Sequence, residues 1–469
     1  MVFGAVNTYT PFKVQGDPIF HGISHVQKVL IVSTELQKET TQKCQSLMKP
    51  PPHQRVPPEI MANIFTYCVE NEVVRLQSPE WCSILCELGH ICARWREIVL
   101  AEPFLWRRID VRSYFPLSQS TLEFLHEILT NRGGSCPVEL QIMPGCNDDW
   151  KALLDLFSTY SSRLRSLQLT INAWNSPTCL QKPMPAFDHV ETVALNFYRP
   201  SYASDDIEGS RVIKAFSTAR RLRKVGIYRE CAYNPNLLDI TSFPWARLTH
   251  LTISCISTSA ISRILCACNE ICELVIGLQV NSSDCHILPA NIRLDHLRSI
   301  NIQFGANCDV VLDRLTTPEL TSLAFGRWAI SSQRCISELV ERSDCELELL
   351  HYPVGETPDI ISLLQGMPYL QVLVVPTTDP ISKECLEKTQ SMNLSPKLHT
   401  IAIPVSSICS AVRFLQNRSP SVFSHRKGEG IQDAKIRMAW KDFAPDKGWF
   451  EALKPELEKN GCTVEVVFK

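Results

Sequence analysis

The sequence predicts an α/β repeat fold, a solenoid of parallel strands with outer helices, preceded by a small module of three helices. Three observations predict it. A short apolar pattern recurs ten times between residues 164 and 403. The segments between the copies carry apolar residues at three- and four-residue steps, as amphipathic helices do. Residues 55–110 contain three further helix-like segments without the recurring pattern.

The recurring pattern is apolar-x-x-apolar-x-apolar. Its copies are LRSLQL, VETVAL, LRKVGI, LTHLTI, ICELVI, LRSINI, LTSLAF, LELLHY, LQVLVV and LHTIAI. Their first residues run from Leu164 to Leu398 in nine steps, a mean step of 26 residues, which is typical of leucine-rich repeats. The fourth and sixth residues of a copy point to one face of a strand. No copy buries that face alone, so the copies are predicted to stack as parallel strands around one core.

The segments between the copies are predicted to return outside the strands as helices. Apolar residues at helical spacing occur at residues 151–160, 260–271, 331–342, 357–367 and 407–418. Each repeat is therefore expected to consist of one strand and one helix. The leucine-rich consensus also places Asn or Cys three residues after the last apolar position, and only the first copy does so, with Asn172. We therefore expect an irregular leucine-rich-repeat solenoid.

The composition excludes some classes of function. Lys and Arg number 47 and Asp and Glu 49, a net charge of −2, so the chain has no overall positive charge with which to bind nucleic acid or an anionic membrane surface. The chain contains no run of 18 apolar residues, so no membrane span is predicted. The N-terminus lacks the basic and apolar regions of a signal peptide. We therefore expect a cytoplasmic and/or nuclear protein whose 20 cysteines remain thiols.

These features divide the chain into five parts. The predicted parts are a tail with a possible helix at 1–50, the helical module at 51–110, a linker and N-terminal cap at 111–163, the solenoid at 164–420 and a C-terminal cap at 421–469. Solenoid ends need polar-faced covers. The covering elements are expected to be strands around Ile109 and Val111 and at Val138–Ile142, Ile436–Trp440 and Thr463–Phe468, with a helix near 447–459.

The helical module is predicted from proline positions and apolar spacing. Its first helix opens with Pro57-Pro58-Glu59, because proline is tolerated in a first turn and Glu favours a helix N-terminus. The second covers roughly 79–88. The third covers 90–100 and ends before Pro103. Four residues of the third helix are expected to share one buried face, namely Ile91, Trp95, Ile98 and Val99.

Two segments of this module carry a family resemblance. VPPEIMANIF followed by ICARWREIVLAEPFLW resembles the F-box, and specifically the F-box-like variety joined to leucine-rich repeats. The resemblance covers residues 55–106 and, more loosely, the array that follows. It departs from the family pattern at Val56, where Leu is usual, and in an insertion around Asn71–Gln77.

The resemblance implies a function. F-box proteins are substrate receptors of cullin-RING ubiquitin ligases, in which the F-box docks onto a Skp-type adaptor and the repeats hold the target. The residues matching the docking surface are Pro57, Pro58, Glu59, Ile60 and Ile64. Two rigid prolines beside an apolar patch form a plausible anchor, but Ile60 and Ile64 could equally pack on Trp95 inside the module. We expect Trp95 and Trp106 to serve the core.

We expect no catalysis, no cofactor and no metal. The chain has no Gly-rich phosphate loop, no G-x-S-x-G and no H-E-x-x-H. One cluster could suggest zinc, since Cys82, Cys86 and His90 recur at steps of four with Cys92 nearby. Structural zinc sites usually use paired C-x(2–4)-C motifs instead. These residues are therefore interpreted as small core residues of the module.

The target is predicted to bind the face opposite the core. The residues alternating with the core positions form an uncharged column of Gln168, Ala194, Gly226, Thr252, Val275, Asn301, Ala324, His351, Val374 and Ala402. Without arginines it is not expected to bind a phosphorylated motif. Just past the strands lies a rim of candidate target-binding residues, Tyr198, Arg199, Tyr228, Arg229, Arg327 and Trp328. Arg and aromatic residues are enriched at interface hot spots. The six rim residues could instead be ordinary exposed loop residues.

Two functional hypotheses follow. The first is a substrate-recognition adaptor of a Skp-cullin-F-box ubiquitin ligase with an unidentified protein target. The second is a leucine-rich-repeat scaffold without ligase association, in which the F-box-like helices only cap the solenoid. Both have the same fold, so binding of the Skp-type adaptor distinguishes them.

Overall fold

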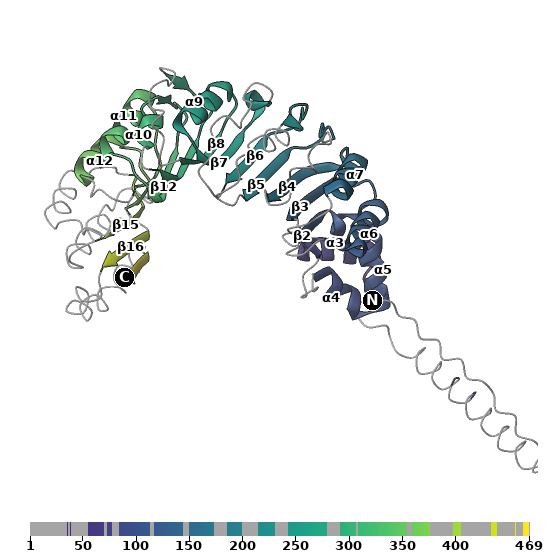
Figure 1. The fold of residues 1–469 in the computed structure, drawn as a ribbon. Coiled ribbons are helices and arrows are strands. Elements are labelled where there is room, and N and C mark those ends of the chain that lie inside the picture. Colours follow the sequence, from purple (N-terminus) through teal and green to yellow (C-terminus); the bar gives the residue numbers. More distant parts are fainter. Residues whose placement is uncertain are drawn as a thin grey trace, which may run out of the picture. The chain divides into compact units, whose positions relative to one another are not determined.

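A computed structural model describes most of the chain (Figure 1). The described residues are Glu35, Lys38, 55–69, 73–76, 84–112, 117–143, 150–172, 185–198, 214–229, 243–278, 291–305, 308–353, 359–375, 397–404, 433–438, Pro455 and 463–468. The chain divides into two compact units, Met1–Ile64 and Phe65–Lys469.

The second unit is built on a parallel β-sheet. Within the described residues it has fifteen strands, each hydrogen-bonded to its neighbours in chain order. They are β1 (Val74–Leu76), β2 (Arg108–Arg112), β3 (Val138–Met143), β4 (Leu164–Asn172), β5 (Thr192–Tyr198), β6 (Lys224–Arg229), β7 (His250–Ile256), β8 (Glu273–Leu278), β10 (Ser299–Gly305), β12 (Ser322–Ala329), β13 (Leu349–His351), β14 (Val372–Val374), β15 (Thr400–Pro404), β16 (Asp433–Met438) and β17 (Thr463–Phe468). This order is that of a solenoid-like array.

The register of the sheet follows the recurring sequence pattern. Gln168 pairs with Ala194, Ala194 with Gly226 and Gly226 with Thr252. The same alignment continues through the column as far as Ala402. On the other face the fourth residues of the copies are buried, and Leu251 is only 1% exposed. The predicted register is therefore confirmed.

Helices lie along one side of the sheet, away from the predicted target face (Figure 1). They are α6 (Gln119–Glu127), followed by a π-helical turn at Ile128–Arg132, α7 (Trp150–Tyr160), α9 (Thr258–Ala267), α10 (Cys308–Leu312), α11 (Gln333–Ser343) and α12 (Ile360–Gly366). Four of the five predicted return helices are confirmed, and 407–418 lies outside the described residues. The start of α9 is fixed by Ser257, whose hydroxyl accepts a hydrogen bond of 3.3 Å from the backbone N–H of Ala260.

The array is less regular than one strand and one helix per repeat. The return from β10 to β12 holds the five-residue α10 and then β11 (Leu315–Thr316), which pairs with β9 (Ile292–Arg293) in a separate two-stranded sheet. A 3-10 turn at Trp245–Arg247 precedes β7. The β10–β12 return contains the expected helix, α10, but it also contains the strand β11, so this repeat departs from one strand and one helix.

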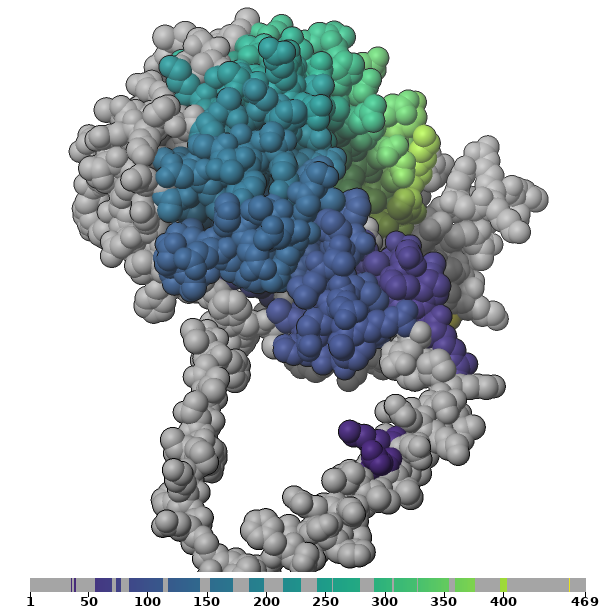
Figure 2. All heavy atoms as spheres, turned by 90° about the vertical axis from the view of Figure 1, so that its right-hand side faces the viewer, coloured from purple at the N-terminus to yellow at the C-terminus, as the bar shows by residue number. Residues whose placement is uncertain are grey.

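Strands extend the sheet at both ends, as expected. Strands β2, β3, β16 and β17 form at or near the predicted positions, although β16 begins at Asp433 and not at Ile436. The segment that departs from the family pattern also contributes, because Val74–Leu76 forms β1 and pairs in parallel with β2. The helix expected near 447–459 falls outside the described residues, apart from Pro455. In Figure 2 the colours of the second unit follow one another over the surface, as expected when each repeat contacts its neighbours.

The helical module contains the three expected helices with shifted bounds. They are α3 (Pro58–Cys68), α4 (Ile84–Ile91) and α5 (Ala93–Ala101), followed by a 3-10 turn at Pro103–Trp106. Cys92 separates α4 from α5 because its backbone is extended, with φ −160° and ψ 167°. The expectation that Ile91 shares a buried face with Ile98 and Val99 is wrong, since Ile91 ends α4 and is 57% exposed.

Of the two aromatic residues expected in the core, Trp106 is buried and Trp95 is half-buried. Trp106 is 4% exposed, and its indole N–H donates a 2.8 Å hydrogen bond to the carbonyl of Val99. The Arg132 guanidinium lies 4.7 Å from the centre of the Trp106 ring, a cation–π contact. The ring of Trp95 packs against that of Phe65 with a centroid separation of 4.8 Å.

Buried thiols of the solenoid should resist alkylation. Burial raises the pKa of Cys268 to about 12 and those of Cys308 and Cys345 to about 11, and it also raises the pKa of Cys335. Only the thiolate reacts, so at pH 8 these four groups stay protonated as well as shielded. Iodoacetamide under native conditions should label the exposed Cys86 and spare these four, as read by peptide mass spectrometry. Labelling of all five at one rate would contradict the described packing.

Candidate protein-docking sites

Helix α3 has one buried face and one exposed face. Pro57 precedes the helix and Pro58 opens it, where no hydrogen bond from the missing N–H is needed. The first backbone hydrogen bond runs from the Met61 N–H to the Pro57 carbonyl at 3.1 Å. Met61 and Phe65, one turn apart, are 5% and 1% exposed. The buried face fixes the orientation of the helix, and with it the orientation of the opposite face.

The opposite face of α3 presents large apolar side chains. Ile60 is 50% exposed, Ile64 46% and Tyr67 80%. Residues at these spacings lie on one side of a helix. Pro57, Pro58 and Glu59 are exposed as well, so all five residues predicted to bind an adaptor lie at the surface. Sequence reasoning missed Tyr67, although its spacing of i+7 from Ile60 continues the same stripe.

Comparison with known proteins bears on this helix. Residues 53–112 match a family model described as F-box-like. Residues 53–112 are an F-box-like domain. The match covers α3, α4, α5 and the strands β1 and β2.

Whole-chain comparisons add little. A search of curated proteins finds no match. Among solved structures, the crystal structure of a protein from Bacteroides fragilis is similar to 78% of this chain over 75% of its own length, at 10% sequence identity and a TM-score of 0.27. A similarity this weak supports no conclusion about fold or function.

Part of the F-box-like domain is continuous with the sheet. Its strand β2 pairs with β1 on one side and with β3 on the other, for example Asp110 with Arg75 and with Gln141. In the hydrogen-bonded order of the sheet, β2 is the direct neighbour of β3. The array and β2 are therefore expected to behave as one piece.

The predicted target rim is only partly described. Tyr228 is 39% exposed and Trp328 69%. Tyr198, Arg229 and Arg327 occupy strand positions, but their side chains lie outside the described residues, as does the whole of Arg199. Tyr228 is on β6 and Trp328 on β12, with β7, β8 and β10 between them. The structure does not bring these two aromatics together.

Aromatic rings cover two glycines of the predicted target face. A Cβ atom placed on Gly226 would lie 2.8 Å from the ring of Tyr228, and one on Gly277 would lie 2.3 Å from the ring of Phe304. Phe304 is also the register neighbour of Trp328. Beside Tyr228 a hollow of about 250 Å³ is lined by Ala194, Gly226 and other residues of β5–β8. Sequence reasoning missed Phe304, because it lies outside the recurring pattern and the pattern therefore does not predict its neighbours.

The described residues show neither a metal site nor a helix that could span a membrane. No group of three or more Cys, His, Asp and Glu side chains there could hold a metal, and Cys82 of the Cys82–Cys92 cluster is not among them. No described helix is long and apolar enough to cross a membrane.

Proposed function

We propose that this protein is the substrate-recognition adaptor of a Skp-cullin-F-box ubiquitin ligase, acting in the cytoplasm and/or nucleus. The observation that carries the proposal is the exposed apolar stripe of Ile60 and Ile64 within the F-box-like domain. The two isoleucines are half exposed on a helix whose other face is buried, so docking a partner there costs little conformational entropy. In this proposal the protein is an adaptor, and the catalysis is carried out by other subunits of the ligase.

In this proposal the array is a leucine-rich-repeat solenoid that holds the target. Its parallel strands at a mean spacing of 26 residues support that assignment. Tyr228 and Trp328 mark the target-binding surface, together with Tyr198, Arg199, Arg229 and Arg327, because exposed aromatics and Arg are favoured at binding hot spots.

The alternative function is a repeat scaffold without ligase association. The observation that favours it is the pairing of β2 with β3, since a domain that continues the sheet could serve as its cap. In that case the stripe on α3 would have no Skp-type partner.

Co-expression separates the two functions. The full chain, co-expressed with a Skp-type adaptor and a cullin, should elute from size-exclusion chromatography as one stoichiometric complex. A folded chain, shown by a cooperative thermal transition, that elutes without the adaptor would contradict the ligase function and leave the scaffold.

A further inference from the structure

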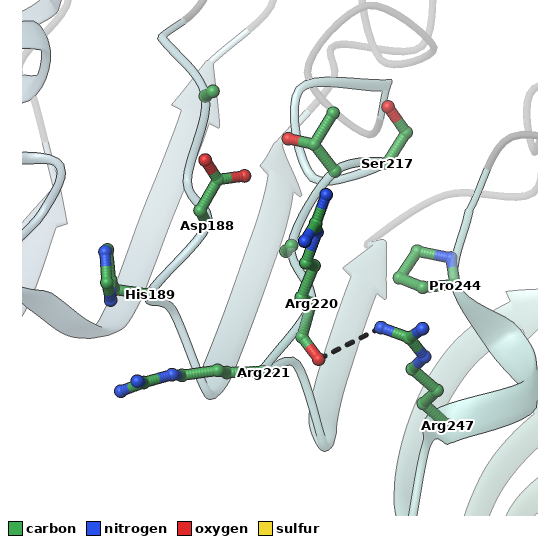
Figure 3. Close-up of a pocket in the computed structure, with 10 residues that line it drawn as sticks. Asp188, His189, Ser217, Arg220, Arg221, Pro244 and Arg247 are labelled. Carbon is green, nitrogen blue, oxygen red and sulfur yellow. Dashed lines mark hydrogen bonds between the residues drawn. The ribbon is translucent and has the colours of Figure 1, made fainter.

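A hollow of about 890 Å³ opens at the edge of the sheet where strands β5, β6 and β7 begin. Residues from three consecutive repeats line it, among them Asp188, His189, Arg220, Arg221, Pro244 and Arg247 (Figure 3). In a parallel array the starts of all strands meet at one edge, so Tyr228 lies toward the other end of β6. The hollow is therefore separate from the predicted rim.

Three other arginines on this edge form ion pairs with carboxylates of different repeats. Arg165 pairs with Glu191 at 2.8 Å, Arg223 with Glu270 at 3.1 Å and Arg298 with Glu319 at 3.3 Å. Each pair joins two different repeats.

The arginines of the hollow differ from these three. Within the described part of the chain, neither Arg220 nor Arg221 forms an ion pair, and the Arg247 guanidinium donates a 3.2 Å hydrogen bond to the Arg220 carbonyl, not to a carboxylate. All three arginines are exposed. Figure 3 shows the Arg247 guanidinium reaching the Arg220 carbonyl, the Arg220 side chain extending toward Ser217, and Arg221 extending to the side of His189.

Three arginines and one carboxylate, Asp188, line the hollow. An anion in the hollow would therefore meet more positive than negative side-chain charge. Arginine forks bind phosphate through paired, charge-assisted hydrogen bonds. The volume exceeds that of a single phosphate group, and the walls add the hydroxyls of Ser217 and Thr218 and the apolar ring of Pro244.

We propose that this hollow binds a phosphorylated side chain, together with its flanking residues, on a peptide segment of a partner protein. Nucleic acid is disfavoured, because it requires a basic stripe along many phosphates, whereas this charge is confined to three repeats of a chain with net charge −2. The proposed binding does not depend on ligase association.

Fluorescence anisotropy with the full chain tests this assignment. The probes are fluorescein-labelled peptide pools with a central phosphoserine between randomised residues, and matched pools with serine or glutamate at that position. The phosphoserine pool should bind about tenfold or more tightly than the serine pool, because each charge-assisted hydrogen bond contributes on that order. Arg220→Gln with Arg221→Gln should remove this preference. Arg298→Gln with Arg334→Gln, which also removes two exposed arginine charges, should keep it.

Four outcomes would overturn the proposal. They are the absence of any preference for the phosphoserine pool, an equal loss in the Arg298/Arg334 control, equal binding of the glutamate pool, and displacement by inorganic phosphate at the concentration at which unlabelled phosphoserine pool displaces. The last two identify an acidic-peptide site or a free-phosphate site. Unchanged thermal transitions in both double variants show that binding, and not folding, is measured.

Discussion

Leu251→Asp is expected to unfold β7 and at least the strands on either side of it. Leu251 is 1% exposed and lies in register with Val225 of β6 and Leu274 of β8. A carboxylate there has no buried partner, so the change should cost about 4 kcal/mol or more. In a repeat array this loss spreads first to adjacent repeats. Urea unfolding and hydrogen exchange of residues 224–278 measure it.

His250→Ala is the matched control for this prediction. His250 is adjacent in sequence but points to the opposite face, where its ring lies 3.5 Å from the exposed carboxylate of Glu273. An exposed pair of this kind contributes about 0–1 kcal/mol. The variant should therefore unfold close to the wild-type midpoint. Similar losses in both variants would show that the assignment of the two residues to opposite faces is wrong.

Ile60→Ala with Ile64→Ala is expected to remove binding of the Skp-type adaptor. Both side chains are about half exposed on a helix whose inner face is buried, so truncation should affect docking more than folding. Two central apolar anchors at about 2 kcal/mol each correspond to a loss of roughly a thousandfold in affinity. Titration of the purified adaptor into the full chain, followed by calorimetry, measures the change.

Ile330→Ala supplies the control, because Ile330 has a similar exposure of 52% but lies at the end of β12. It should bind the adaptor as the wild type does. If the Ile60/Ile64 variant also bound with wild-type affinity while remaining folded, α3 would not be the docking helix.

The sheet could be predicted from the sequence because its signal repeats. Side chains alternate with a period of two, and a slip of one residue would expose every core leucine. Ten copies therefore fix the register from Gln168 to Ala402. The module was harder to place, since one extended residue, Cys92, shifts the end of α4 and turns Ile91 outward. Strand β1 was hidden in a segment with no repeat signal.

The candidate sites could be predicted only where a pattern names their residues. The family resemblance indicates Ile60 and Ile64, but the sequence left open whether they are exposed or pack on Trp95, and the structure shows them half exposed. The arginine hollow was missed because Arg220, Arg221 and Arg247 precede their repeat copies, where the apolar pattern places no constraint. Whether an arginine has an acidic partner depends on side chains of the next repeats, as Arg223 and Glu270 show.

The even spacing of the strands sets a length for any bound segment. Tyr228 and Trp328 are four strand steps apart, or about 19 Å at roughly 4.8 Å per step. An extended peptide advances about 3.3 Å per residue. A segment lying across the strands therefore needs about six residues to reach from Tyr228 to Trp328, and a shorter one can contact only one of the two aromatics.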